Sequence, residues 1–191
     1  WLFKRKIQVA MKQNNKDKLK GNVEADETLI GGYTNKNKGR SLESKQAVLL
    51  TTEKLSDGRT GNIRMQPIEN FEAITLKFAL KDMISHDASI TTDHHRSYQN
   101  LKKEMNIETI LSNKGQSMEE LHKQIMQFKN WLRGIHHKCS AQHLFAYADE
   151  YVFRFNRRNN RKAIFHKVIN KMMHQIPHPY LVLKTLYHYS T

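Results

Sequence analysis

The stretch of sequence that decides the fold is Val23-Glu24-Ala25-Asp26-Glu27-Thr28-Leu29-Ile30, which ends at Gly31-Gly32. Apolar and polar side chains alternate along it, and this period of two predicts a β-strand over 23–30. Glu24, Asp26 and Thr28 then share one face of the strand. Acids are poor strand formers, and a carboxylate on a core strand costs desolvation energy that a bound divalent cation can offset. The stretch therefore predicts both a sheet and a candidate site at Asp26.

Further apolar runs separated by turn residues predict more strands in the first part of the chain. Strands are expected over 47–52, 62–66, 88–93 and 107–111, and helices over 71–85 and 97–105. Asn70 stands where it can cap the first of these helices. A basic, turn-rich stretch over 12–22 and a polar loop over 33–46 flank the first strand.

The second half of the chain has helical patterns. Ser117 and Glu120 form a capping box, and apolar residues then recur at alternating spacings of three and four. This stripe consists of Met118, Leu121, Ile125, Phe128, Leu132 and Ile135. Ser140 is expected to cap another helix, and a last helix is expected over 161–174. Strands followed by helices predict an α/β fold with a mixed sheet and a helical C-terminal half.

Composition restricts the class of partner. The chain has 191 residues, of which 32 are Lys or Arg and 18 are Asp or Glu. The net charge of +14 indicates nucleic acid first and an anionic membrane surface second, with a solvated basic face as the alternative. The single cysteine, Cys139, excludes an internal disulfide and fits a cytoplasmic protein. No apolar run approaches the roughly 18 residues of a membrane span. Because the chain opens on Trp1, we expect it to be part of a longer protein.

Asp93 is the second carboxylate that stands out by position. It ends an otherwise uncharged strand over 88–92. Two such acids in a basic chain suit metal-assisted phosphoryl chemistry, because Mg²⁺ prefers oxygen ligands and binds one or two carboxylates together with substrate phosphate. The alternative is that Glu24 and Glu27 face solvent and that Asp93 begins a turn.

A third cluster lies on the helix that follows Ser117. His122 and Lys129 are seven positions apart, so they share one face about 10 Å apart along the axis, and Arg133 continues that face. A single His on an amphipathic helix is more often structural or solvated than functional. Glu119, one turn before His122, is a competing acid.

Basic residues are also grouped near the end of the next helix. Arg154, Arg157, Arg158 and Arg161 are expected on one side of a helix. The planar guanidinium fork suits phosphate, so this group is a candidate DNA-binding surface. A solvated helical face is the alternative.

Several of these stretches resemble the conserved blocks of bacterial insertion-sequence transposases of the ISXO-like group. The stretch over 23–32 is similar to their first catalytic block, and Thr92-Asp93 with Ser97-Tyr98 is similar to their second. The runs over 128–137 and 151–158 resemble their third block and its closing signature. The resemblance runs from about residue 1 to 170, and the last two runs are its most specific part.

The resemblance implies an RNase H-like catalytic core with a triad of the D-D-E type that binds divalent Mg²⁺ or Mn²⁺. Carried over, the metal ligands are Asp26, Asp93 and, seven positions before Lys129, His122. Family members more often have an acid at the third position, and their glycine after the second aspartate is His94 here. Members usually carry an N-terminal DNA-binding region, commonly a zinc ribbon, which would precede this chain.

The function implied is metal-dependent DNA strand cleavage and strand transfer of an insertion sequence. Lys129, Arg133 and the arginines at 154, 157, 158 and 161 would contact double-stranded DNA at the transposon ends and target, and the protein would act as a homo-oligomer on DNA. The first alternative is a catalytically inactive DNA-binding remnant, because the third ligand is not an acid. The second is an RNA-binding basic protein, although the aromatic RNA-binding motifs are missing.

Two structural expectations follow. The catalytic domain is expected over 23–175, between a lead-in and basic loop over 1–22 and a C-terminal tail over 176–191. The strands of Asp26 and Asp93 are expected to be neighbours, with the helix of His122 packed across their ends. Their carboxylates would then lie roughly 4–7 Å apart, close enough to share one or two ions.

Overall fold

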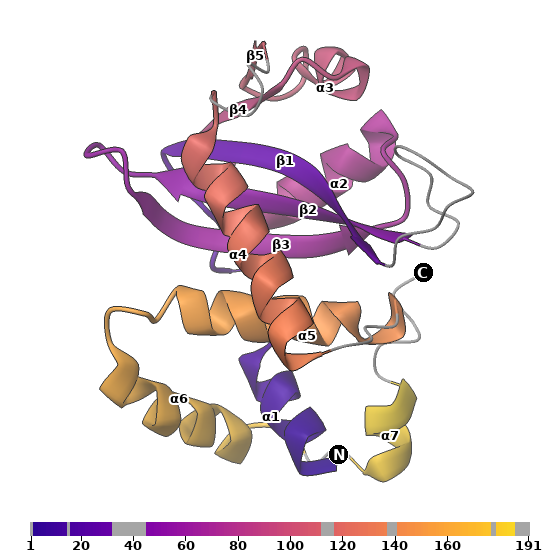
Figure 1. Ribbon diagram of the computed structural model, residues 1–191, viewed down its shortest axis with the longest axis vertical. Coiled ribbons are helices and arrows are strands. Elements are labelled where there is room, and N and C mark those ends of the chain that lie inside the picture. The colour runs from indigo at the N-terminus through magenta and orange to yellow at the C-terminus, as the bar shows by residue number, and fades with distance from the viewer. Residues whose placement is uncertain are drawn as a thin grey trace. The chain divides into compact units, whose positions relative to one another are not determined.

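The computed structural model describes residues 2–14, 16–31, 45–111, 117–136, 141–176 and 179–185 (Figure 1). The chain divides into two compact units, one formed by Asn15–Lys138 and the other by Trp1–Asn14 with Cys139–Thr191. The first unit contains β1 (Asn22–Gly31), β2 (Lys45–Lys54), β3 (Thr60–Ile68), α2 (Ala73–Met83), β4 (Ser89–Asp93), α3 (Arg96–Leu101), β5 (Ile107–Ile110) and α4 (Glu119–Ile135). The second contains α1 (Leu2–Met11), α5 (Ala141–Phe155), α6 (Arg161–Met173) and α7 (Tyr180–Thr185).

In the described residues of the first unit, five strands form one mixed sheet in the order β3-β2-β1-β4-β5. The strands β1, β2 and β3 pair as an antiparallel meander, while β4 is parallel to β1 and β5 is parallel to β4. The strand β1 is central, because β2 pairs with one of its edges and β4 with the other. This is an α/β fold of the RNase H-like type, and the expected fold class is confirmed.

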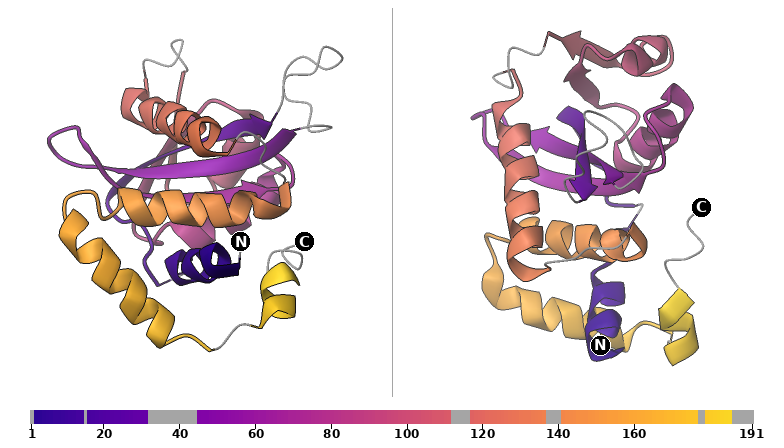
Figure 2. Two further views of the ribbon diagram at one scale, coloured as in Figure 1. Left: turned by 60° about the horizontal axis from the view of Figure 1, so that its bottom comes forward. Right: turned by 45° about the vertical axis from the view of Figure 1, so that its right-hand side comes forward.

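Helices cover both faces of this sheet, and the right-hand view of Figure 2 shows the strands between α4 and α2. The α2 side holds the main apolar core, because alternate residues of β1 and β2 point to it. Its members include Val23, Ala25, Leu49, Leu76, Leu80, Ile90 and Tyr98, all nearly inaccessible to solvent. On the opposite face α4 packs against β1 and β2. Because both faces of β1 are covered, even its polar residues Glu24 and Thr28 are almost inaccessible to solvent.

All the expected strands are present, and β2 and β3 are longer than expected. They extend to Lys45–Lys54 and Thr60–Ile68, because their polar ends pair across a hairpin. Its turn is closed by Gly58, whose φ of 81° favours glycine. The expected loop over 33–46 lies largely outside the described residues.

The start of α4 corrects one expectation. The capping box at Ser117 and Glu120 is wrong, because the N-cap residue is Met118 and no side chain caps the helix. The Ser117 hydroxyl instead donates to the carbonyl of Leu111 at 2.9 Å, and Glu120 pairs with Lys123. The apolar stripe is nevertheless buried from Met118 to Leu132, and only its last member, Ile135, is exposed.

The other helix starts differ less from expectation. The helix α2 begins at Ala73, two residues later than expected, and its N-cap residue is Glu72 rather than Asn70. Asn70 accepts hydrogen bonds from the Glu72 amide and the Thr75 hydroxyl in the turn before the helix. Ser140 lies outside the described residues. Among the helices described in these ranges, none combines the length and hydropathy that crossing a membrane requires.

In the second unit, α1 contacts α5, α6 and α7. A small apolar core joins Ala10 and Met11 of α1 to Phe153 of α5 and Val168 of α6. Polar contacts add to it, since the Gln8 amide donates to Glu150 at 3.0 Å. The sequence assigned no element to residues 1–11 or to the tail, where α1 and α7 lie.

Candidate functional site

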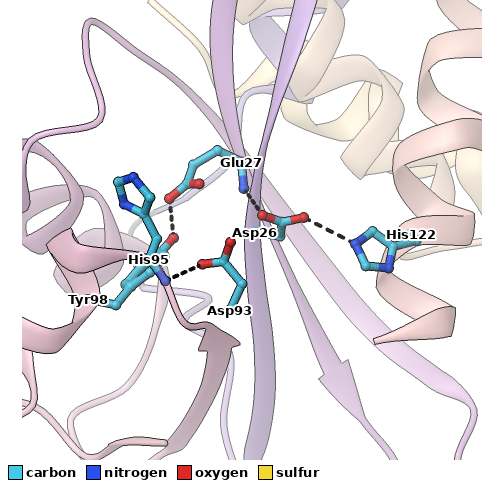
Figure 3. Close-up of polar contacts among 6 residues, drawn as sticks. All are labelled: Asp26, Glu27, Asp93, His95, Tyr98 and His122. Atoms are coloured by element: carbon cyan, nitrogen blue, oxygen red, sulfur yellow. Dashed lines mark hydrogen bonds and ion pairs between the residues drawn. The ribbon is translucent and has the colours of Figure 1, made fainter. Parts of the chain in front are cut away.

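The parallel pairing of β1 and β4 places two acids side by side. Its register runs from Asn22 opposite Ser89 to Ala25 opposite Thr92. The next residues on the two strands are Asp26 and Asp93, and their side chains lie next to each other (Figure 3). The expectation that these acids occupy neighbouring strands is confirmed, while the separation of 4–7 Å stays a prediction.

The helix α4 brings His122 to this pair from the face of the sheet that it covers. The His122 Nε2 atom lies 3.2 Å from Asp26 Oδ2, and the Asp26 side chain is only 15% exposed. Figure 3 shows Asp26 between Asp93 and His122. The competing acid, Glu119, has a side chain that is 70% exposed and pairs with Lys123 at 2.9 Å. Of the two candidates for the third position, the structure therefore brings His122 to the acids.

The Asp26 carboxyl is held in an environment that opposes its negative charge. Burial raises the pKa of Asp26, and the neighbouring charge of Asp93 raises it further. His122 and a hydrogen bond from the Glu27 amide, at 2.8 Å, act in the opposite direction and lower that pKa. A divalent cation between the two carboxylates would offset both the burial and the repulsion.

Lys129 lies on the same side of α4 as His122, two turns further along, and is partly buried. Burial and the nearby Arg133 lower the pKa of Lys129, while the charge of Asp26 raises it. Lys129 is thus within electrostatic reach of the Asp26 carboxylate. Arg133 follows in the last turn of α4 and is exposed. Asp26, Asp93 and His122 therefore lie together, with Lys129 two helical turns from His122 on the same side of α4.

The four predicted DNA-binding arginines lie in the second unit, and the expectation that they share one helix face is wrong. The helix α5 ends at Phe155 and α6 begins at Arg161, so a turn over 156–160 separates them. The side chain of Asn160 begins α6 by accepting a hydrogen bond from the Ala163 amide at 3.3 Å. A run of asparagines favours such a turn over a continuous helix.

Each of these arginines has its own surroundings. Arg154 is tied to Glu150 by two hydrogen bonds of 2.8 and 3.0 Å. The guanidinium groups of Arg157 and Arg158 stack over the rings of Phe153 and Phe155, at 3.9 and 4.1 Å from the ring centres. Arg161 is exposed at the start of α6. Each of these two guanidinium groups also donates to a backbone carbonyl, Arg157 to Phe153 at 3.2 Å and Arg158 to Phe155 at 3.1 Å. Their positive charge can still attract phosphate.

Sequence reasoning gave no role to two residues beside the site. Tyr98 of α3 is fully buried, and its hydroxyl donates to Glu27 Oε1 (Figure 3). The only sequence signal for this contact is the Ser97-Tyr98 pair that follows Asp93, since the tyrosine and the glutamate are 71 positions apart.

Within the described part of the chain, no three His, Cys, Asp or Glu side chains are grouped as a metal site. The donor set at the paired acids nevertheless fits a divalent cation, because two carboxylates lie side by side and the charge of Asp93 disfavours ionisation of the buried Asp26. An imidazole beside them adds a nitrogen donor, which Mn²⁺ accepts more readily than Mg²⁺ does.

A mixed sheet of this topology, with acids paired on β1 and β4 in a strongly basic chain, has the architecture of the RNase H-like nucleases and transposases. The chain belongs to the family of the ISXO2-like transposase domain, whose sequence model matches residues 18–156. The expected family is confirmed, and its members' kind of activity is nuclease or strand transferase on DNA. Neither the curated proteins nor the solved structures contain a match to the chain.

The environment of Asp26 predicts a gain in stability when its charge is removed. We expect Asp26→Asn, without metal, to raise the free energy of unfolding at pH 7. The pKa of Asp26 is higher in the folded protein than in the unfolded chain, so the folded state binds this proton more tightly. The wild type therefore loses stability as the pH rises from the pKa of the unfolded chain to the higher pKa of the folded protein. The gain of the variant should therefore shrink as pH falls from 7 towards about 4, where the carboxyl is increasingly protonated in both states.

Urea unfolding in EDTA across this pH range measures the effect. Asp57→Asn is the control, because Arg59 lowers the pKa of the exposed Asp57 and the same substitution should give no gain. A gain for Asp26→Asn that is constant with pH would contradict this assignment.

Proposed function

We propose that the protein is a DNA transposase that cleaves strands at the ends of an insertion sequence and transfers them to target DNA. The observation that carries the proposal is that Asp26 and Asp93 lie side by side where the β1–β4 pairing ends, with His122 hydrogen-bonded to Asp26. Paired acids on a buried strand serve no packing purpose, and family membership supplies the class of reaction.

In this proposal the residues have distinct tasks. Asp26 and Asp93 hold a divalent cation, Mg²⁺ or Mn²⁺, with His122 as the third ligand. The bound cation supplies Lewis-acid chemistry to phosphoryl transfer. Lys129 is close enough to Asp26 to hold a DNA phosphate beside the acids, and Arg133 is exposed one turn further along to contact the same strand.

One observation favours a second candidate, a catalytically inactive DNA-binding remnant. An imidazole at the third position removes one negative charge relative to the acid that is usual there. It also hydrogen-bonds to Asp26, so that two of the three proposed ligands contact each other. Metal-dependent nicking of a duplex that carries the ends of the element separates the two functions. Strand cleavage supports the transposase, and DNA binding without cleavage in either Mg²⁺ or Mn²⁺ supports the remnant.

We further propose that the catalytic domain extends over 23–175 and acts as a homo-oligomer on double-stranded DNA in the cytoplasm. The family match runs across both compact units and ends one residue after α5. The helix α6 packs through Val168 against Phe153 of α5, which lies inside the matched region, and this contact supports a domain end beyond residue 156.

The arginine group gives a prediction about DNA affinity. We expect Arg157→Ala with Arg158→Ala to weaken binding of a nonspecific duplex and to reduce the slope of log K against log salt by up to about 2, since each lost phosphate contact removes about 0.9. Arg154→Ala should have less effect, because Glu150 already holds that guanidinium. Fluorescence anisotropy at several salt concentrations measures both quantities.

Arg59→Ala is the matched control for this experiment. Arg59 is an exposed arginine that pairs with Asp57 in the hairpin turn of the other unit. Its removal lowers the net charge by one without touching the arginine group. If Arg59→Ala gave half the loss seen in the double variant, only the net charge would matter.

A further inference from the structure

The strand pairing between β1 and β4 stops one residue before the acids. The last paired residues are Ala25 and Thr92, and Asp26 and Asp93 come directly after them. The two carboxylates therefore lie where the ladder of backbone hydrogen bonds has just ended. Asp26 still pairs with Leu50 of β2 and Asp93 with Ile110 of β5, but the β1–β4 register does not extend to the two acids. A further contact between the two strands would oppose the repulsion of like charges placed side by side.

A side-chain hydrogen bond lies one residue beyond that point. Glu27 follows Asp26 on β1, and successive residues of a strand point to opposite faces, so its side chain enters the α2 side of the sheet. There it accepts a hydrogen bond from the hydroxyl of Tyr98. Tyr98 is fully buried and belongs to the main apolar core. Burial keeps the pKa of the Tyr98 hydroxyl well above its ordinary value, so it remains a donor at neutral pH.

The helix that carries Tyr98 also fixes Asp93. The Asp93 Oδ1 atom accepts a hydrogen bond from the His95 amide at 3.1 Å, in the turn that leads into α3. The Ser97 hydroxyl donates to the carbonyl of Phe71 at 2.6 Å, which ties the start of α3 to the segment before α2. Movement of α3 would therefore move the Asp93 carboxylate with it.

We propose that Glu27 and Tyr98 are positioning residues, whose hydrogen bond holds the Asp93 turn against β1 and so sets the spacing of Asp26 and Asp93. The inference rests on the proposed role of these acids as metal ligands. Glu27 is partly buried and its Oε2 atom is shielded from solvent beside the apolar core, which is costly for a carboxylate. Its hydrogen bond with Tyr98 links β1 to the helix that follows the Asp93 turn.

The test uses the full chain with three substitutions. Tyr98→Phe removes the donor and keeps the ring in place, while Glu27→Met removes the acceptor at similar size. Each single variant leaves one polar group without its partner, which lowers stability. The double variant removes both groups and should therefore be more stable than either single variant. Glu27→Gln is the conservative variant, because its amide oxygen can still accept the Tyr98 proton. Ile84→Val, a small deletion in the same core, is the control for general loosening.

Two readouts separate positioning from packing. The first is hydrogen exchange at the His95 amide, compared with amides of β2 and β3. Tyr98→Phe should speed exchange at His95 by about tenfold, the equivalent of one lost hydrogen bond, and leave the sheet amides as in the control. The second is Mn²⁺ affinity by calorimetry, which should fall at least about tenfold, as for other residues that orient metal ligands.

The double variant gives the decisive result. We expect it to unfold at a urea concentration near that of the wild type while its Mn²⁺ affinity and His95 exchange stay altered, and we expect Glu27→Gln to resemble the wild type in both. Recovery of affinity and exchange in the double variant would overturn the proposal, because the pair would then act only through stability. If the wild type binds no Mn²⁺ and cleaves no DNA, the proposed function fails, and His95 exchange alone decides whether the pair positions Asp93.

Discussion

We expect Asp26→Asn and Asp93→Asn each to lower metal-dependent cleavage of element-end DNA by at least about a thousandfold, because loss of a metal ligand would remove several kcal/mol of transition-state stabilisation. The loss should be the same in Mg²⁺ and in Mn²⁺, since both cations use these oxygens. Nicking of a labelled duplex by the full-length protein measures the effect. DNA affinity of each variant should stay at or above that of the wild type, because the substitution removes negative charge.

Glu24→Gln is the matched control for this loss. Glu24 lies two residues before Asp26 on the same face of β1, is almost fully buried, and pairs with Lys54 at 3.0 Å. It is thus an acid of the same strand with an assigned structural partner. Its amide variant should fold and cleave DNA. Cleavage that survives in Asp93→Asn, or that is lost equally in Glu24→Gln, would show that the paired acids are not the reaction site.

The second large effect concerns the choice of metal at His122. We expect wild-type cleavage to be faster with Mn²⁺ than with Mg²⁺, because Mg²⁺ prefers oxygen ligands and binds imidazole poorly. His122→Glu should raise the rate with Mg²⁺ by about tenfold or more, and His122→Ala should lower the rate with both cations, as loss of an orienting or ligating group does. Cleavage rates at saturating concentrations of each cation measure the ratio.

Glu119→Gln is the control that separates the two candidates for the third position. Glu119 lies on the same helix, and its exposed side chain pairs with Lys123. Its variant should leave both the rate and the preference for Mn²⁺ unchanged. If Glu119→Gln abolishes cleavage while His122→Ala retains it, Glu119 is the ligand and His122 only contacts Asp26.

The sheet could be predicted because its signals are local. The alternation along β1 and the apolar stripe on α4 each indicate a buried face within a single element, so no knowledge of tertiary contacts is needed to predict them. Asp26 and Asp93 stood out for the same reason, since each acid interrupts or ends a strand. His122 was predicted from the seven-residue spacing to Lys129 that the family resemblance implies. The structure places its imidazole in contact with Asp26.

The helix α1 could not be predicted because its buried face is partly polar. Arg5 and Gln8 are almost completely buried in this helix, and the hydrogen bond from Arg5 to Gln8 offsets part of the cost of removing them from water. The partner that accepts from Gln8, Glu150, lies 142 positions away in the sequence. No local pattern reports such a contact. The hydrogen bond between Tyr98 and Glu27 escaped prediction for the same reason.

The parallel pairing of β1 with β4 has a consequence for the order in which the chain folds. The meander of β1, β2 and β3 joins consecutive strands, whereas Asp26 must meet Asp93 across 67 intervening steps of chain and His122 across 96. Closing longer loops costs more entropy, so we expect the antiparallel hairpins to form before these distant contacts. The proposed metal site would then assemble among the last events of folding, after the sheet that carries Asp26 has begun to form.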